Sequence, residues 1–208
     1  MRTAILVTKV GGSLFGYEQM PERVHAWRER QPPGMTIFIG GGGDLVRPLR
    51  TAHERFGLNE ESSHWLAIRA MTVTSRLLAK LLDVELVERF EVIQQLASTR
   101  RMAACVLDVE EFLRQREPGL PGCRLPCDWS ATSDAIAARV AEVLSADELV
   151  LLKSVAYPAA TTLQGAADLG LVDGHFPTAV AGVARLRWVN LRAAELDDGV
   201  ILSAAGSK

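Results

Sequence analysis

Two glycine-rich segments of this 208-residue chain could bind a phosphate group. Lys9 is followed after one residue by Gly11, Gly12 and Ser13, and an unbroken run of glycines fills positions 40–43. Glycine allows several backbone N–H groups to turn toward one anion, and the Lys9 ammonium would add positive charge. The alternative for each segment is an ordinary tight turn.

Neither segment fits the commoner nucleotide-binding motifs. A Walker A loop carries its lysine after the glycines, whereas Lys9 precedes them. A dinucleotide-binding loop that started at Gly40 would need a glycine where Leu45 stands. Both of these motifs are therefore excluded.

Two further charged residues occur in informative places. Asp134 follows Thr132 and Ser133 at the start of an apolar helical pattern, and Lys153 ends an apolar run that starts at Leu149. The alternative for the first segment is helix capping by Ser133 or Thr132, with Asp134 favoured by the helix dipole. The alternative for Lys153 is a solvated strand end.

Short apolar runs that end at these segments predict buried strands. Thr3–Val7 leads to Lys9, and Met35–Ile39 leads to the glycine run. Further runs occur at Glu85–Val87, Ala103–Val109, Leu149–Lys153 and Arg187–Asn190.

Helical patterns alternate with the apolar runs. They occur around Pro21–Trp27, from about Asp44, from Glu60 to Leu82 with Ser62 or Ser63 near the start, and from Asp134 to Leu144. This alternation predicts an α/β fold with a mainly parallel sheet covered on both faces.

Composition restricts the class of protein. The chain is 48% hydrophobic and 23% charged, as in globular domains, and its net charge of -2 argues against a nucleic-acid partner. No apolar window is long enough to span a membrane and the first residues do not resemble a signal peptide, so we expect no membrane partner and a cytoplasmic protein. Cys105, Cys123 and Cys127 lack metal-ligand spacing, which favours reduced thiols over a metal site.

Taken together, four ordered segments resemble the amino acid kinase superfamily, which includes acetylglutamate, aspartate, carbamate, isopentenyl phosphate and uridylate kinases. The segments are KVGGS at 9–13, GGGG at 40–43, TSDAIAA at 132–138 and LVLLKS at 149–154. They cover about the first three quarters of the chain. One such motif would be unspecific, whereas the ordered set is informative.

The resemblance implies an open αβα sandwich, α/β in class, formed by residues 1–208 as one domain. Residues 1–127 would form an acceptor-side lobe and residues 128–208 a trimmed nucleotide-side lobe, with the irregular segment Glu117–Cys127 between them. ATP and Mg²⁺ are the implied cofactors, a small-molecule phosphate or carboxylate the implied acceptor, and a homo-oligomer the implied assembly.

The resemblance also assigns roles to individual residues. Lys9 would contact the transferring phosphoryl group, Asp134 would orient Lys9, and Lys153 would be a second cation near the nucleotide phosphates. The phosphate would accept hydrogen bonds from backbone N–H groups of the two loops, at Gly11, Gly12, Ser13, Gly41 and Gly42. After Lys153 the chain departs from the family, because a Val-Asp-Gly-like turn is replaced by the sequence Ser154-Val155-Ala156-Tyr157. The candidate nucleotide-binding residues are Lys153, Ser154 and Tyr157.

The acceptor residues implied by the resemblance are Gly43, Asp44, Arg47, His64 and Thr132. Uridylate kinases have a similar Gly-Gly-Gly-x-x-x-Arg arrangement, which favours a phosphate on the acceptor. The segments Ser63–Met71 and Asp128–Asp134 also resemble kinases of methanofuran-type cofactor synthesis, which phosphorylate an aminomethylfuran phosphate. Two alternatives remain open, namely that Arg47 is a surface arginine and that His64 is a partly buried core histidine.

Three hypotheses about function follow. The first is an ATP-dependent small-molecule kinase, and the second is a non-catalytic ligand-binding or storage protein with the same fold. The third is a structural subunit, which would not require Lys9, both glycine loops and Asp134 together.

Overall fold

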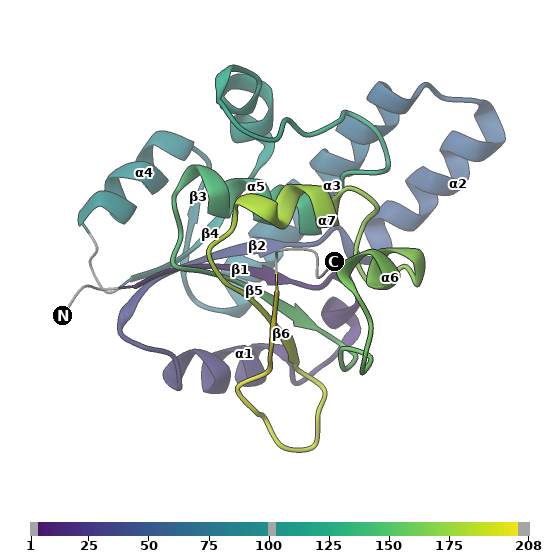
Figure 1. Cartoon of the computed structure of the whole chain (residues 1–208). Helices are drawn as coiled ribbons and strands as arrows, with labels where there is room; N and C mark the ends of the chain where they lie inside the picture. Colours follow the sequence, from purple (N-terminus) through teal and green to yellow (C-terminus); the bar gives the residue numbers. More distant parts are fainter. Residues whose placement is uncertain (1–3, 100–102, 204–208) are drawn as a thin grey trace.

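The computed structural model describes residues 4–99 and 103–203, and its centre is a seven-stranded sheet (Figure 1). Thr3, where the first apolar run begins, lies outside the described residues. The order of strands across the sheet is β3-β4-β2-β1-β5-β6-β7. The strands are β1 (Ala4–Val10), β2 (Gly34–Gly40), β3 (Glu85–Val87), β4 (Ala103–Leu107), β5 (Glu148–Lys153), β6 (Leu186–Asn190) and β7 (Val200–Leu202).

All the strand pairs are parallel except that of β6 with the edge strand β7. Nearly every residue of β1, β2 and β5 is buried. Strands covered on both faces need apolar residues in succession, which is why their sequences appear as unbroken hydrophobic runs. The prediction of a mainly parallel, covered sheet is confirmed.

Helices cover both faces of this sheet, with α1 below it and α5 and α7 above it in the view of Figure 1. The α-helices are α1 (Met20–Glu29), α2 (Val46–Phe56), α3 (Glu60–Leu81), α4 (Phe90–Thr99), α5 (Ser133–Val143), α6 (Leu163–Asp168) and α7 (Phe176–Ala179). Trp27 of α1 is fully buried in one core, while Ile136 of α5 belongs to the other. None of the described helices is long and apolar enough to cross a membrane.

The strand order places a crevice at the end of β1. Within the sheet, β2 is the neighbour of β1 along one edge, and β5 is its neighbour along the other edge, followed by β6. In open α/β sheets, ligands bind outside the carboxyl ends of the strands at such a switch point. Lys9 lies near the carboxyl end of β1 and Lys153 at that of β5.

Some elements differ from the sequence-based expectations. Strand β1 extends beyond Val7 to Val10, so that Lys9 belongs to the strand itself. Helix α3 is capped by Asn59, whose side chain accepts a hydrogen bond from the backbone of Ser62, because an N-cap residue stands just before the first turn. The sequence patterns did not indicate α4, α6, α7 or β7.

The irregular segment between the expected lobes is held by a buried arginine of α5. Arg139 is fully buried, lies 3.4 Å from Glu117 and 2.7 Å from Glu142, and donates to the carbonyl of Leu120. Burial of a guanidinium is costly without such partners. The start of this segment is therefore fixed against α5, although only short helical turns are found there.

The two glycine loops pack backbone against backbone. An ideal Cβ atom placed on Gly12 would lie 2.5 Å from the nitrogen of Gly43, and one on Gly41 would lie 2.8 Å from the nitrogen of Gly12. Gly43 also has a positive φ of 57°. Glycine is required at these positions because a side chain would separate the loops.

Gly12→Ala should therefore lower the free energy of unfolding by about 1–3 kcal/mol, the usual cost of forcing an extra methyl group into a packed site. Chemical denaturation measures this difference. Gly16→Ala is the matched control, since a Cβ atom there meets no atom within 4 Å. Equal stability of the two variants would contradict the close approach of the loops.

Candidate active site

The ends of β1, β5 and α5 bring two lysines and one aspartate together. The Lys9 Nζ atom lies 3.0 Å from Asp134 Oδ1, and Lys153 Nζ lies 2.9 Å from both oxygens of Asp134. The three residues are only 4, 5 and 8% exposed for Lys9, Asp134 and Lys153 respectively. We call them the lysine–aspartate cluster.

Strand geometry explains why both lysines face the same helix. Side chains alternate between the two faces of a strand, so Lys9 points to the same face as Val7, and Lys153 to the same face as Leu151. Val7 and Leu151 belong to the core that also contains α5. Asp134 is the second residue of that helix, and the cluster therefore forms between the sheet and the start of α5.

The cluster perturbs the acid–base behaviour of its members. Burial by itself raises the pKa of Asp134, but the neighbouring Lys153 and Lys9 ammonium groups overcome this effect and the pKa is lowered. Burial, together with the charge of Lys9, lowers the pKa of Lys153 to about 8, against the opposing effect of Asp134. Asp134 is therefore ionised at neutral pH.

Lys153 has two further neighbours. Its Nζ atom donates to the carbonyl of Leu171 over 2.7 Å and lies 5.1 Å from the ring centre of Trp188. A solvated strand end would have no such contacts. The alternative interpretation of Lys153 from the sequence is therefore wrong.

The glycine loops require one correction. We expected N–H groups of Gly11, Gly12, Gly41 and Gly42 to face a phosphate, but Gly11 N donates to Leu152 O and Gly41 N donates to Val10 O. These two bonds continue the strand pairing past the strand ends, so both amides are already used.

Within the described part of the chain, the N–H groups of Gly12 and Gly42 donate to no backbone acceptor. Gly12 is the first residue of a short 3-10 helix (Gly12–Gly16), where an N–H group has no acceptor within the helix. Gly42 directly precedes another short 3-10 helix (Gly43–Leu45). The hydroxyl groups of Ser13 and Ser154 lie 2.9 Å apart and connect the first loop to the segment after β5.

A cavity of about 710 Å³ opens above the cluster. Every residue to which the sequence assigned a role lines it, with the exception of Tyr157. The hydroxyl of Tyr157 donates to Thr161 O, and its ring packs edge-on against Trp188. Tyr157 is therefore a packing residue in this structure, and the assignment of a nucleotide contact to it is not supported by its position.

His64 has features both of a core histidine and of a residue that could contact an acceptor, the two interpretations that the sequence left open. It is buried and its Nδ1 atom lies 3.2 Å from the carbonyl oxygen of Asp128, yet it also lines the cavity. A carbonyl can only accept, so Nδ1 carries the proton, and burial lowers the pKa of the ring. The neutral ring therefore has Nε2 as a hydrogen-bond acceptor.

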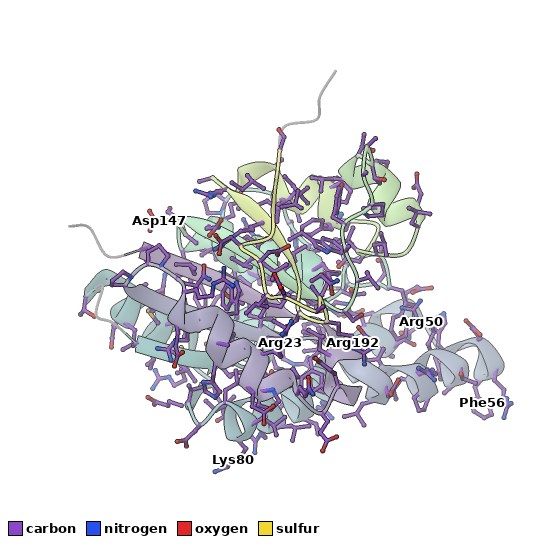
Figure 2. The ribbon with its side chains drawn as sticks, turned by 90° about the horizontal axis from the view of Figure 1, so that it is seen from below. Arg23, Arg50, Phe56, Lys80, Asp147 and Arg192 are labelled. Atoms are coloured by element: carbon purple, nitrogen blue, oxygen red, sulfur yellow. The ribbon has the colours of Figure 1, made fainter. Side chains whose placement is uncertain are left out.

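Two arginines of α2 line the mouth of the cavity. Arg47 is 80% exposed and forms an ion pair of 2.7 Å with Asp44 one turn away. The Arg50 guanidinium lies 4.7 Å from the ring centre of Trp129, and Figure 2 shows Arg50 on a helix that projects from the body of the protein. Sequence reasoning assigned no role to Arg50 or Trp129, because their contact joins distant segments.

Asp173 is a further residue that sequence reasoning missed. Its Oδ2 atom accepts hydrogen bonds from Thr132 N, Thr132 Oγ1 and Ala135 N, at 3.0, 2.9 and 2.9 Å. Burial, and then the charge of Asp134, raises the pKa of Asp173. The available signal was the sequence Val172-Asp173-Gly174, which lies well beyond the position after Lys153 where the family resemblance directed attention.

Asp134→Asn keeps the shape of the side chain but removes its charge. Because the charge of Asp134 opposes the effects of burial and of Lys9, Lys153 should lose its proton at a pH below its wild-type value of about 8. Selective ¹⁵N labelling of the four lysines, followed by an NMR titration, measures this shift. An unchanged titration of Lys153 would instead favour a simple helix-dipole role for Asp134.

This chain is similar to known proteins in its structure, whereas comparisons of its sequence find no match. No protein-family model and no curated protein sequence matches the chain. Solved structures do match, among them uridylate kinase from Archaeoglobus fulgidus, with a TM-score of 0.57 and 17% identity over 88% of this chain and 89% of that one.

Two other matches have the same character. UMP kinase from Bacillus anthracis has a TM-score of 0.61 and 11% identity, and the match covers 93% of this chain and 90% of that one. Aspartate kinase from Synechocystis has a TM-score of 0.64 and 17% identity over 99% of this chain but only 41% of that one. The chain therefore has the α/β fold of these kinases, and the open sandwich with a mainly parallel sheet that its motifs predicted is confirmed.

Proposed function

We propose that this protein transfers the γ-phosphoryl group of ATP to a small-molecule acceptor. The observation that carries the proposal is the lysine–aspartate cluster in the cavity, which is also lined by Gly12 and Gly42. A fold alone does not need two buried lysines that share one carboxylate. Positive charge and N–H groups around one point are the parts that phosphoryl transfer requires.

In the proposed mechanism the protein positions the reactants and balances charge. The Lys9 ammonium forms an ion pair with Asp134, which would fix its direction, and its N–H groups could bind an oxygen of the transferring group. Lys153 supplies the second positive charge on the nucleotide side. The acceptor oxygen attacks the phosphorus directly, with no covalent intermediate on the protein.

In this proposal Mg²⁺ would enter the cavity together with the nucleotide. Among the described residues, no group of three or more His, Cys, Asp or Glu side chains could hold a metal. Mg²⁺ commonly keeps several waters and binds substrate phosphates, where it neutralises their charge. Lys153 and Ser154 would hold the phosphates of ATP.

For the acceptor we propose a phosphate rather than a carboxylate. Arg47 and Arg50 both line the cavity mouth, and a guanidinium binds a dianionic phosphate through two parallel hydrogen bonds. Two of the structural matches are named as uridylate or UMP kinases, whereas the aspartate kinase keeps a carboxylate acceptor as the alternative. An aminomethylfuran phosphate and a nucleoside monophosphate are the two phosphorylated classes to test first.

A non-catalytic ligand-binding or storage role is the second candidate. It is favoured by the segment after Lys153, where the family turn is absent and Tyr157 lies away from the cavity. Release of ADP upon mixing the protein with ATP, Mg²⁺ and a panel of phosphorylated and carboxylate acceptors separates the two functions. Binding of ATP without any product would favour the storage role.

We also propose that the protein self-associates. Helix α3 exposes Leu66, Val73, Leu77 and Leu81 on one side, at steps of seven, four and four residues. Burial of such a stripe against a second copy would remove apolar surface from water. Sedimentation of the full chain measures the oligomeric state directly.

Lys9→Ala should lower turnover by about three orders of magnitude while the fold persists, because the ammonium acts on the transferring group. The measurement is the steady-state rate of ADP formation with the acceptor found in the screen. Lys80→Ala is the matched control, since Lys80 is exposed on α3 and points away from the protein (Figure 2). Equal rates in the two variants would refute the role of Lys9.

Arg47→Lys should raise KM for a phosphorylated acceptor and leave KM for ATP nearly unchanged. A lysine keeps the charge but cannot form the two parallel hydrogen bonds of a guanidinium. Arg55→Lys, an exposed substitution near the end of the same helix, is the control. If both KM values stay at wild-type levels, Arg47 is a surface arginine and the argument for a phosphate acceptor loses this support.

A further inference from the structure

The segment Gly170–Gly174, between α6 and α7, forms one wall of the cavity. It is attached to the site at two points. Lys153 Nζ donates to Leu171 O, and Asp173 accepts three hydrogen bonds from the start of α5. A segment distant in sequence is thus bonded both to a lysine of the cluster and to the helix that carries Asp134.

Asp173 supplies the N-terminal cap that α5 does not provide for itself. Thr132 occupies the N-cap position, but its side chain makes no capping hydrogen bond and its hydroxyl donates to Asp173. The first amide groups of a helix have no acceptor within the helix, and Ala135 N is one of them. Asp173 Oδ2 satisfies Ala135 N and also holds Thr132 N.

The capped turn is also the turn that carries Asp134. Asp134 lies between Thr132 and Ala135 in the sequence. The backbone N–H groups of these two residues donate hydrogen bonds to Asp173. The contacts of Asp134 with both lysines are between 2.9 and 3.0 Å, so a shift of about 1 Å in this turn would break them. Errors of this size in a catalytic arrangement can cost a factor of about 10² in rate.

The bonding of Asp173 is unusual for a residue with only a capping role. Its Oδ1 atom is buried and has no hydrogen-bond partner within the described residues. A buried carboxylate with one unsatisfied oxygen is costly, whereas a serine or threonine could cap a helix without this cost. The carboxylate instead accepts three hydrogen bonds on a single oxygen and thereby fixes one residue on each side of Asp134, namely Thr132 and Ala135.

We propose that Asp173 is a positioning residue, which holds the first turn of α5 so that Asp134 lies between Lys9 and Lys153. The effect of this positioning on catalysis rests on the phosphoryl transfer proposed above. The positioning itself does not, because it concerns the arrangement of the cluster in the protein without ligands.

The four lysines of the chain make a direct test possible. With ¹⁵N-labelled lysine side chains, the titration of Lys153 can be followed by NMR in the full-length protein without nucleotide or metal. In Asp173→Ala the turn loses three acceptor bonds, Asp134 moves away from the lysines, and Lys153 should titrate below its wild-type value of about 8, as in Asp134→Asn. Asp173→Asn keeps a carbonyl oxygen as acceptor and should restore most of the wild-type titration.

Two more variants keep the test decisive. Thr132→Val removes only the hydroxyl donor and should produce a smaller shift of Lys153 in the same direction, even if Asp173→Ala fails to fold. Asp168→Asn alters an exposed carboxylate on α6, whose recorded partner is Gln164, and should change nothing.

A wild-type titration of Lys153 in folded Asp173→Ala, or in Thr132→Val where the alanine variant does not fold, would overturn the positioning role. Steady-state kinetics then test the consequence for catalysis, where we expect kcat to fall by about 10²-fold in Asp173→Ala with both KM values within a factor of two. A shifted titration in a protein that shows no phosphoryl transfer would refute the proposed function and leave the positioning role intact.

Discussion

The structure depends on one carboxylate that lies between two buried ammonium groups. Without Asp134, the positive charges of Lys9 and Lys153 would face one another while both side chains are almost fully buried. Burial and repulsion both disfavour the charged form of a lysine, and an ion-paired carboxylate offsets them only when its geometry is good. The site therefore requires that two strands and a helix end be placed within a fraction of an ångström.

The fold meets this requirement through several local features. The alternation of side chains along β1 and β5 directs both lysines to the α5 face of the sheet. Alanines at 135, 137 and 138 let α5 lie close to the strands, and the side-chain-free contact between Gly12 and Gly43 brings the two loops together beside the cluster. Asp173, from the segment between α6 and α7, completes the first turn of the helix.

The sequence predicted those parts of the site that depend on local patterns. Lys9, the glycine loops and Asp134 could be found because each follows a strand or opens a helix, and the order of the segments pointed to the fold. Asp173, Arg50 and Trp129 could not be assigned roles in this way, because their contacts join segments far apart in the chain. The sequence also did not show that the amides of Gly11 and Gly41 bond to neighbouring strands. This pairing depends on how far each strand continues.

The most direct test of the account is whether ATP reaches both lysines of the cluster. Protein with ¹⁵N-labelled lysine side chains would be titrated with Mg²⁺ and a non-hydrolysable ATP analogue, and binding would be followed in parallel by calorimetry. The account predicts that the resonances of Lys9 and Lys153 shift together as the analogue binds, while that of Lys80 stays unchanged. Saturable binding with no change at Lys9 and Lys153, or no binding of the analogue, would contradict it.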